Sequence, residues 1–543
     1  MFEVDAYYAT AACSALLLVT MLLCYFFMFK YDTSSSSSSK GKKLPPYAPV
    51  TFSEIRRIFL NIKGLEKVTF CSKVGELLKD DPSVRSKYGL IFRMPSMKVK
   101  YSIMTTDYEI SKLVLQGNHE ANIVESEKSK LSYGLNFLDP KVFNLVTHKT
   151  SNKDREHARK AYAVNFSYNS LQKQWVFMEE ALLEEFSYFR SLIGGDAKGV
   201  INVKNEMLQF FLRVLGRSTF GIEFTFDGTE QEDTINGLEY LEMQETACRD
   251  RIMSINIPFR WLMFWDADVR QGQVAVKHLK EVSDKILFHH QKRKRTKDIA
   301  GRTPLIDLID QETYPSHIAK ASDINILLFA GHDTTAFSFS FILMEIVRHP
   351  EVKAKLLAEI ASVMPKAPLG SSVAEGRHEQ TAAADTLQHG DVKLMSAIIG
   401  LEYLNWCMKE AMRLWPVAAF GPIRELSQDF HVGEDLVLPK GSLVQSMFYS
   451  MFRSDWIDRP DEFIPERWSP TNPQLPQLKE MWIPFSSGKR ACLGMNLALF
   501  QMRLFAAYFL HYFDFELTCE PTFEFFVTLK PDQLLMKVTE RVH

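Results

Sequence analysis

Apolar residues recur at spacings of three and four along much of the chain between residues 150 and 420, a periodicity typical of amphipathic helices. The pattern predicts helices at 182–192, 203–215, 318–348 and 351–363. A polar stretch at 365–390, which contains Gly and Ala residues, interrupts the helical region and is expected to form a surface loop or insertion.

Strand patterns are fewer and lie near the C-terminal end of the chain. Residues 431–437 and 442–445 flank the turn sequence Pro439-Lys440-Gly441, so they are predicted to pair as a hairpin. Residues 526–529 and 534–538 are predicted to form another hairpin. Helices followed by a minority of hairpins predict a mainly α fold with small β-sheets.

The N-terminal segment at 7–29 contains no charged side chain and is long enough, as a helix, to cross a hydrocarbon core of roughly 30 Å. Glu3 and Asp5 precede it, and basic residues follow it, which by the positive-inside tendency places the rest of the chain in the cytosol. A cleaved signal peptide is the alternative, but it would start with basic residues and have a shorter apolar run.

The chain is therefore expected to divide into four parts. They are a short lumenal N-terminus at 1–6, a transmembrane anchor at 7–29, a linker rich in Ser, Lys and Pro at 30–49, and one catalytic domain at 50–543. The serines of the linker favour flexibility and its prolines stiffen the chain. Whether the linker sets a distance or only connects its neighbours stays open.

Composition narrows the possible functions. The formal net charge of -2 gives no reason to expect nucleic acid as a partner. The 40 Phe residues indicate a large aromatic core. The seven cysteines form no CxxC pair, which argues against a zinc site, and their odd count and irregular spacing argue against a disulfide framework. Most are expected to be buried apolar residues, and only Cys492 has a context that suggests more.

That context is the sequence Phe485-Ser486-Ser487-Gly488-Lys489-Arg490-Ala491-Cys492-Leu493-Gly494. A tight loop before a cysteine can direct backbone N–H groups at its sulfur, and Gly488 allows the chain to bend there. A buried cysteine in a Gly-containing turn is the simpler interpretation. The loop nevertheless resembles the haem loop of cytochromes P450 at all five fixed positions of the family pattern. The resemblance implies haem b with Cys492 as axial iron ligand, Arg490 on a propionate, and Phe485, Gly488 and Gly494 shaping the loop.

A second motif, Ala330-Gly331-His332-Asp333-Thr334-Thr335, lies inside the predicted helix at 318–348. By itself, Asp-Thr-Thr could cap a new helix, or the Gly and Thr residues could open the helix over a ligand. The motif resembles the distal-helix motif of the same family. The resemblance implies that Thr334 and Asp333 are the catalytic alcohol and acid, which deliver protons during dioxygen activation. His332 falls at a variable position and is taken as an ordinary helix residue.

Three further residues carry a structural role by resemblance. Glu410 and Arg413 are three residues apart and would share one helix face, which alone suggests a surface ion pair. They resemble the Glu-x-x-Arg motif of cytochromes P450, and Arg467 in Pro465-Glu466-Arg467-Trp468 resembles the third member of that family's buried triad. The resemblance implies that the triad supports haem incorporation and takes no part in the chemistry.

The family resemblance also implies roles for other residues, but their sequence motifs match the family less closely. Arg424 and Arg159 resemble residues that bind haem propionates, although Arg155 stands where the family has Trp. Several residues are expected either to line an apolar substrate pocket or to be plain core: Phe329, Ala330, Val417, Ala418, Phe525 and Phe526.

The family resemblance implies a monooxygenase that inserts one atom of O2 into an apolar substrate. The chain after Cys492 is too short for a flavin or nicotinamide domain, so NADPH-cytochrome P450 reductase, with cytochrome b5 as a further donor, is the expected electron source at the endoplasmic reticulum membrane. A lipid, fatty acid, sterol or terpenoid would fit, and the sequence does not choose among them. The alternatives are a haem-thiolate isomerase or dehydratase and a non-catalytic haem-binding protein.

Overall fold

The structure is a computed structural model. It describes residues 44–45, 89–94, 102–116, 127–128, 135–139, 141–148, 152–195, 199–256, 260–263, 265–296, 304–311, 316–365, 392–433 and 436–542. The predicted anchor at 7–29, nearly all of the linker, and the polar stretch after residue 365 lie outside the described residues. The chain divides into two compact units, one formed by 1–129 with 420–460 and the other by 130–419 with 461–543.

The first unit contains a five-stranded sheet with the order β1-β2-β10-β7-β3. These strands are β1 (Ile91–Met94), β2 (Ser102–Thr105), β10 (Leu443–Ser446), β7 (Ile423–Glu425) and β3 (Glu127–Lys128). β10 runs parallel to β2 and antiparallel to β7. The helix α4 (Tyr108–Gln116) contributes Val114 to a buried apolar cluster with Ile91, Ile103 and Val444. The short helix α15 (Phe448–Met451) follows β10.

The first predicted hairpin is wrong in its pairing. β8 (Phe430–Val432) pairs with β9 (Leu436–Leu438), so the chain reverses inside the segment predicted as one strand. Gly433, with φ of 61°, adopts the left-handed conformation that this reversal requires. The Pro-Lys-Gly turn exists, with Gly441 at φ of 78°, but it leads into β10, which pairs with β2 and β7 and not with the segment at 431–437.

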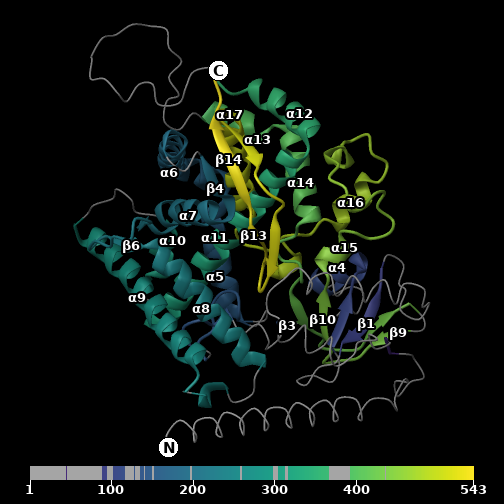
Figure 1. Ribbon diagram of the computed structural model, residues 1–543. Coiled ribbons are helices and arrows are strands. Elements are labelled where there is room, and N and C mark those ends of the chain that lie inside the picture. The colour runs from purple at the N-terminus through teal and green to yellow at the C-terminus, as the bar shows by residue number, and fades with distance from the viewer. Residues whose placement is uncertain are drawn as a thin grey trace, which may run out of the picture. The chain divides into compact units, whose positions relative to one another are not determined.

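The second unit is mainly helical, as predicted (Figure 1). Its longer helices are α5 (Lys153–Ala163), α6 (Tyr168–Gly194), α7 (Val203–Leu215), α8 (Gly237–Asn256), α9 (Ala267–Thr296), α11 (His317–Arg348), α12 (Pro350–Ala361), α14 (Glu402–Leu414) and α17 (Met495–Tyr512). Shorter helices are α10 (Pro304–Ile309), α13 (Val392–Ile399) and α16 (Leu475–Met481). All four segments predicted as helices fall on α6, α7, α11 and α12.

Aromatic side chains form the core where α7, α11 and α17 meet. The rings of Phe210 and Phe505 lie 4.8 Å apart between centroids, and those of Phe211 and Phe339 lie 5.5 Å apart. Phe505 and Phe509 are four residues apart, so they share one face of α17. Among the described helices, only α11 is long and apolar enough to cross a membrane, and its burial identifies it as the central helix of this unit.

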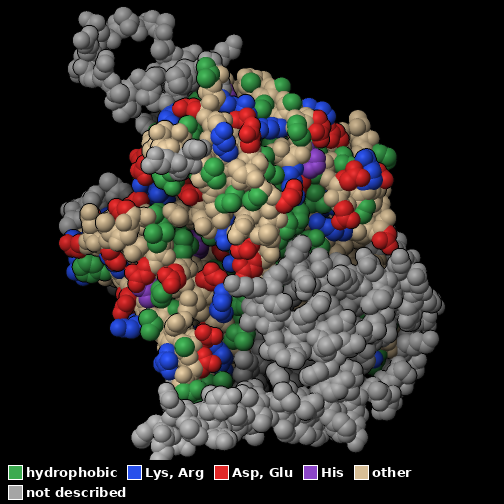
Figure 2. Space-filling model, in the orientation of Figure 1, with side chains coloured by type: hydrophobic (Ala, Val, Ile, Leu, Met, Phe, Trp, Pro, Cys, Tyr) green, Lys and Arg blue, Asp and Glu red, His purple; other side chains and the backbone are tan. Residues whose placement is uncertain are grey.

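Small sheets complete the second unit. β11 (Phe513–Leu517), β14 (Leu535–Glu540) and β4 (Val200–Asn202) form one sheet, and β5 (Glu223–Thr225) and β6 (Thr234–Asn236) form a parallel pair. β12 (Thr522–Phe525) and β13 (Leu529–Gln533) form a hairpin. The second predicted hairpin is therefore wrong, because residues 526–528 are the tip of the β12–β13 hairpin and β14 pairs with β11 and β4. Figure 2 shows acidic and basic side chains interspersed over this unit.

Replacing Phe505 by Ala should lower the free energy of unfolding by about 3–5 kcal/mol, because the ring is fully buried among other aromatic rings and the vacated space cannot collapse completely. Thermal denaturation followed by circular dichroism measures the change. The matched control is Phe288→Ala on α9, whose side chain is 56% exposed and should leave the melting temperature nearly unchanged. Equal effects of the two substitutions would contradict this assignment of the core.

Candidate active site

The loop at 485–494 closes on itself immediately before α17. The Cys492 N–H donates to the Phe485 carbonyl at 2.8 Å, and the Ala491 N–H donates to the Gly488 carbonyl at 3.0 Å. Ser486 and Gly488 have φ of 61° and 70°, so the bend that was expected at Gly488 involves two left-handed residues. Such a conformation is costly for Ser, and it persists only where the surrounding structure enforces it.

The Cys492 side chain combines accessibility with a desolvating environment. Solvent reaches the residue, which is exposed, while burial by surrounding atoms is the main cause that raises the pKa of its thiol. A hydrogen bond from the Gly494 amide and the charge of Arg159 act in the opposite direction. A ligand can therefore reach this residue, and one backbone donor, the Gly494 amide, tunes its sulfur.

Two arginines brace the loop. Arg159 on α5 donates from Nη2 to the Ala491 carbonyl at 2.7 Å, so the sequence-predicted Arg159 lies beside Cys492. Arg490 donates from Nη2 to the Val146 carbonyl at 2.5 Å. The neighbouring Leu145 N–H donates to Asp323 on α11 at 2.7 Å. One turn at 144–147 thus connects the cysteine loop to the central helix, a link that no sequence motif indicated.

The Asp-Thr-Thr motif lies within continuous helix and does not cap a new one. Thr334 Oγ1 donates to the Ala330 carbonyl at 2.8 Å, and Thr335 Oγ1 donates to the Gly331 carbonyl at 2.9 Å. Packing explains why position 331 is Gly, because a Cβ there would lie 2.8 Å from a methyl carbon of Leu215 on α7. Ala330 is exposed and Thr334 half-buried, although the helix is mostly buried, so solvent reaches this side of α11.

Asp333 is held by a residue distant in sequence. Thr528 Oγ1 donates to its Oδ2 at 3.0 Å. Burial raises the pKa of Asp333 to about 6, against the opposing influence of Lys530 and Thr528. Its neighbour His332 is buried with Nδ1 2.7 Å from the Leu328 carbonyl oxygen, and burial lowers its pKa to about 4. His332 is therefore neutral, and within the described residues no three His, Cys, Asp or Glu side chains gather as a metal site.

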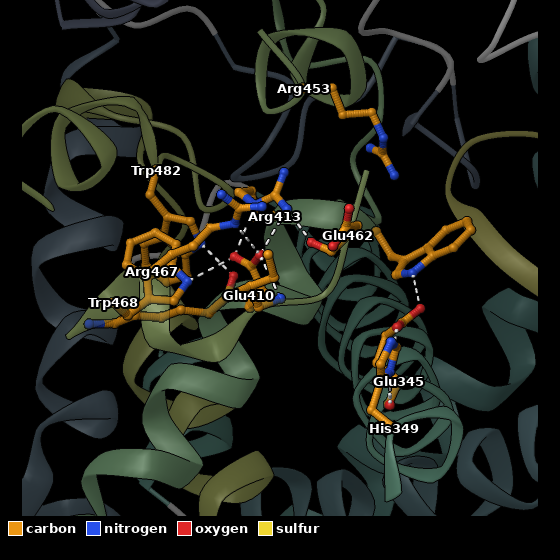
Figure 3. Close-up of polar contacts among 12 residues, drawn as sticks. Glu345, His349, Glu410, Arg413, Arg453, Glu462, Arg467, Trp468 and Trp482 are labelled. Atoms are coloured by element: carbon orange, nitrogen blue, oxygen red, sulfur yellow. Dashed lines mark hydrogen bonds and ion pairs between the residues drawn. The ribbon is translucent and has the colours of Figure 1, made fainter. Parts of the chain in front are cut away.

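The three residues of the predicted triad meet around one buried carboxylate (Figure 3). Glu410 accepts from Arg413 Nε and Nη2 at 2.9 and 2.8 Å, and from Arg467 Nε at 2.9 Å. Two further donors were not anticipated. They are Trp468 Nε1 at 3.0 Å and the Ile464 N–H at 3.2 Å. Trp468 adjoins Arg467 in the sequence, and only that adjacency could have suggested it.

Another contact missed by sequence reasoning, which is partly buried, connects α11 to the segment after α14. Trp415 Nε1 donates to Glu345 Oε1 at 2.7 Å. The Trp415 ring stacks on Phe341 of α11 with centroids 5.1 Å apart. These contacts fix the start of the segment that contains Val417 and Ala418.

The residues proposed from sequence for the substrate side lie in two groups. Phe329 packs edge-on against Phe137 at 5.2 Å, and its neighbour Ala330 is exposed. The second group is the 417–418 segment with the β12–β13 tip, joined by the Leu529 N–H to the Val417 carbonyl at 2.8 Å. Ala418 is exposed and Phe525 is buried. Phe526 lies beneath the Arg249 guanidinium, 5.9 Å from it.

Arg424 lies on β7 in the first unit, where Val444 of β10 and Lys128 of β3 flank it in register. Its proposed contact with a cofactor bound at Cys492, which belongs to the second unit, stays a prediction.

The donor set fits an iron porphyrin. An accessible sulfur with a backbone N–H directed at it suits a thiolate ligand to iron. A cysteine that coordinates a metal has lost its thiol proton. The flanking Arg490 and Arg159 supply cations for carboxylate groups. A Cβ on Gly494 would meet no protein atom within 4 Å, so the backbone beside Cys492 presents an open face that a flat ring could cover.

The comparisons agree with this chemistry. A family model described as cytochrome P450 matches residues 69–538. The chain is 28% identical over 391 residues to a probable cytochrome P450 4p3 of Drosophila melanogaster, an alignment covering 65% of this chain and 66% of that protein. It is 30% identical over 234 residues to a lithocholate 6-beta-hydroxylase of Mesocricetus auratus, covering 42% and 41%.

A third relative is the human cytochrome P450 3A5, to which the chain is 31% identical over 210 residues, covering 38% of this chain and 36% of that protein. The chain therefore spans about two thirds of the length of the Drosophila relative and less than half of the other two.

Replacing Arg467 by Met should destabilise the protein by about 3–5 kcal/mol, because the buried Glu410 carboxylate loses one of its cations while remaining desolvated. The yield of folded protein and its melting temperature measure the loss. Lys355→Met is the matched control, since Lys355 pairs with the adjacent Glu466 at 2.7 Å at an exposed position and should have little effect. A stable Arg467→Met variant would contradict the structural role of the triad.

Proposed function

We propose that this protein, which belongs to the cytochrome P450 family, is a membrane-anchored haem-thiolate monooxygenase that inserts one atom of O2 into an apolar organic substrate. The proposal depends on one observation. The same compact unit contains an accessible cysteine in a closed loop and a helix with an acid–alcohol pair at the point where solvent reaches it. A protein that only bound haem would need the cysteine but not the pair.

When bound, the haem supplies an iron centre that activates dioxygen with electrons delivered from outside the protein. Cys492 would hold the iron through its sulfur, and the hydrogen bond from the Gly494 amide would withdraw charge from that sulfur. By the family resemblance, Arg490, Arg159 and Arg424 would bind the propionates. Phe485 accepts the hydrogen bond that closes the loop and Gly488 allows its bend, so the two would maintain the loop that presents the sulfur to the haem.

Asp333 and Thr334 move protons. With a pKa of about 6, the Asp333 carboxyl is protonated in roughly a tenth of molecules at neutral pH, so it can both give up a proton and regain one from water. Thr334 donates its own hydrogen to the Ala330 carbonyl and therefore presents its lone pairs to a donor. Glu410, Arg413 and Arg467 take no part in these transfers and keep α14 and the segment before the cysteine loop in place.

The substrate is proposed to be a lipid, fatty acid, sterol or terpenoid. Its contacts are with Phe329, Ala330, Val417, Ala418, Phe525 and Phe526, which are apolar. The hydroxylase activity in the name of the Mesocricetus auratus relative supports oxygen insertion at a carbon centre. Retention of Asp333 and Thr334 favours this reaction over isomerisation or dehydration, which need no protons for oxygen cleavage.

Electrons are proposed to come from NADPH through NADPH-cytochrome P450 reductase, with cytochrome b5 as a further donor. The enzyme would lie at the endoplasmic reticulum membrane, single-pass, with its catalytic domain in the cytosol. The exposed Lys489 beside the cysteine loop suits an acidic redox partner. Reconstitution with the reductase in vesicles, followed by substrate screening through spectral shifts, tests both the electron source and the substrate class.

Cys492→Ser should abolish the red-shifted Soret band of the reduced carbon monoxide complex, because oxygen cannot replace sulfur as the electron-rich axial ligand. The measurement is a carbon monoxide difference spectrum of purified protein. Cys519→Ser, which alters an exposed cysteine outside the loop, serves as control and should preserve the band. Survival of the band in Cys492→Ser would refute haem-thiolate ligation by this residue.

Thr334→Ala should lower the product formed per NADPH by about tenfold or more and release the lost electrons as hydrogen peroxide, since a positioned acid–base group contributes at least that factor. The ratio of product to NADPH is measured with any substrate from the screen. The adjacent Thr335→Ala removes a hydroxyl with the same backbone bond but at a buried position, and should keep the ratio. Unchanged coupling in Thr334→Ala would exclude it from proton delivery.

A further inference from the structure

The tip of the β12–β13 hairpin contacts several elements of the proposed active site. Thr528 reaches α11 through its hydrogen bond to Asp333. Leu529 binds the Val417 carbonyl, which fixes the hairpin beside the 417–418 segment. Phe526 lies under Arg249 of α8 at 5.9 Å. The position of the Thr528 hydroxyl is therefore set by contacts on both sides of it along the chain.

Lys530, the second residue of β13, places its ammonium group near Asp333. Its Nζ lies 3.7 Å from Glu245 Oε1 on α8 and 3.7 Å from Glu524 Oε2 on β12. It also lies 5.9 Å from the ring centroid of Phe337, one helical turn beyond Asp333. Since its side chain is only 13% exposed, its charge acts on Asp333 with little screening by solvent.

Within the part of the chain that the structure describes, the other titratable groups that interact with Asp333 come from α8. Tyr240 and Cys248 are buried, and burial together with the Asp333 charge raises the pKa of each. Both therefore stay neutral around physiological pH. Glu245 opposes ionisation of Asp333, and Lys530 favours it. Apart from burial, the described residues that act on the Asp333 carboxyl are therefore the Thr528 hydroxyl, which contacts it directly, and the charges of Lys530 and Glu245.

We propose that Thr528 is a positioning residue for Asp333, whose hydroxyl holds that carboxyl toward the hairpin while Lys530 supports the arrangement electrostatically. The proposal rests on the proton-delivery role of Asp333 given above. It adds a residue about 200 positions away, outside the acid–alcohol motif, on which the orientation and ionisation of the acid depend.

Loss of the Thr528 hydroxyl or of the Lys530 charge shifts the pKa of Asp333 in one direction. A hydrogen bond to a carboxylate favours its charged form, as does a nearby ammonium, and both lower the pKa of Asp333 against the effect of burial. Removing either one raises the pKa above its present value of about 6. The carboxyl then stays protonated up to a higher pH, and the pH at which proton delivery changes moves in the same direction.

Thr528→Val, which replaces the hydroxyl by a methyl group of similar size, and Lys530→Met test the proposal in the haem-loaded enzyme. The first readout is the infrared carboxyl band of protonated Asp333, identified by its loss in Asp333→Asn and titrated with pH. The second is hydrogen peroxide released per NADPH across the same pH range. Both midpoints should rise, by about one pH unit in Thr528→Val, as expected for the loss of a hydrogen bond to a carboxylate.

Two controls separate this role from general support of the hairpin. Thr528→Ser keeps the hydroxyl and should restore the original midpoints. Thr522→Val removes the hydroxyl that accepts from the Gln533 N–H at 3.1 Å at the far end of the same hairpin, and should leave both midpoints unchanged. All variants are first checked for a normal carbon monoxide difference spectrum, so that loss of fold or haem is not mistaken for a shift.

The possible failures are distinguishable. An unchanged infrared midpoint in Thr528→Val, or an equal shift in Thr522→Val, overturns the positioning role of Thr528. Unchanged peroxide release in Asp333→Asn instead overturns the proposed function of Asp333, while the infrared titration still reports whether Thr528 and Lys530 act on that carboxyl.

Discussion

One hydrogen bond closes the loop on which the site depends, from the Cys492 N–H to the Phe485 carbonyl. Within the closed loop, Ser486 and Gly488 adopt left-handed conformations, which carry a steric cost for Ser. Neighbouring contacts enforce the conformation. Arg159 holds the loop from α5, and α17 starts directly after the loop and anchors it in the aromatic core. The packed helices of this unit thus serve to keep one strained turn, and the sulfur it presents, in a fixed direction.

The buried carboxylate of Glu410 imposes a second constraint on the same unit. Removing this charge from water carries a penalty of several kcal/mol, and only well-placed donors offset it. Arg413 comes from the same helix, whereas Arg467 and Trp468 come from the segment that precedes the cysteine loop. The carboxylate is satisfied only when both segments are correctly placed, so it couples the placement of that later segment to α14. Such coupling explains why a buried charge can be retained although an apolar core would be no less stable.

Sequence reasoning succeeded where the determining pattern is local. The helices follow from a periodicity that repeats every few residues, and the cysteine loop is a contiguous motif. The burial of the Glu410–Arg413 pair followed only from the family resemblance, because the spacing of these two residues alone suggested a surface ion pair. Sequence reasoning failed where partners are distant. β10 lies between β2 and β7, and no turn sequence near residues 439–441 could reveal that. Nothing in the sequence indicated that Thr528 matters, because Thr528 and Asp333 are far apart in the chain and a Thr in a hairpin tip forms no recognisable motif. A glycine inside a predicted helix was noticeable at position 331. Its cause, the close approach of Leu215, is a tertiary contact that the sequence does not show.

The central helix α11 serves two purposes that conflict energetically. One side contributes Phe339 to the aromatic core, and the other places Asp333 where burial raises its pKa from 3.8 to about 6. Because the folded protein holds this proton more tightly than the unfolded chain, stability falls as the pH rises from about 4 to about 6, and the full cost, roughly 3 kcal/mol, applies at neutral pH. The buried carboxyl that we propose for proton transfer is thus unfavourable for folding. The aromatic contacts of α7 and α17 against the same helix offset that cost, so the large Phe content and the perturbed acid are two parts of one arrangement.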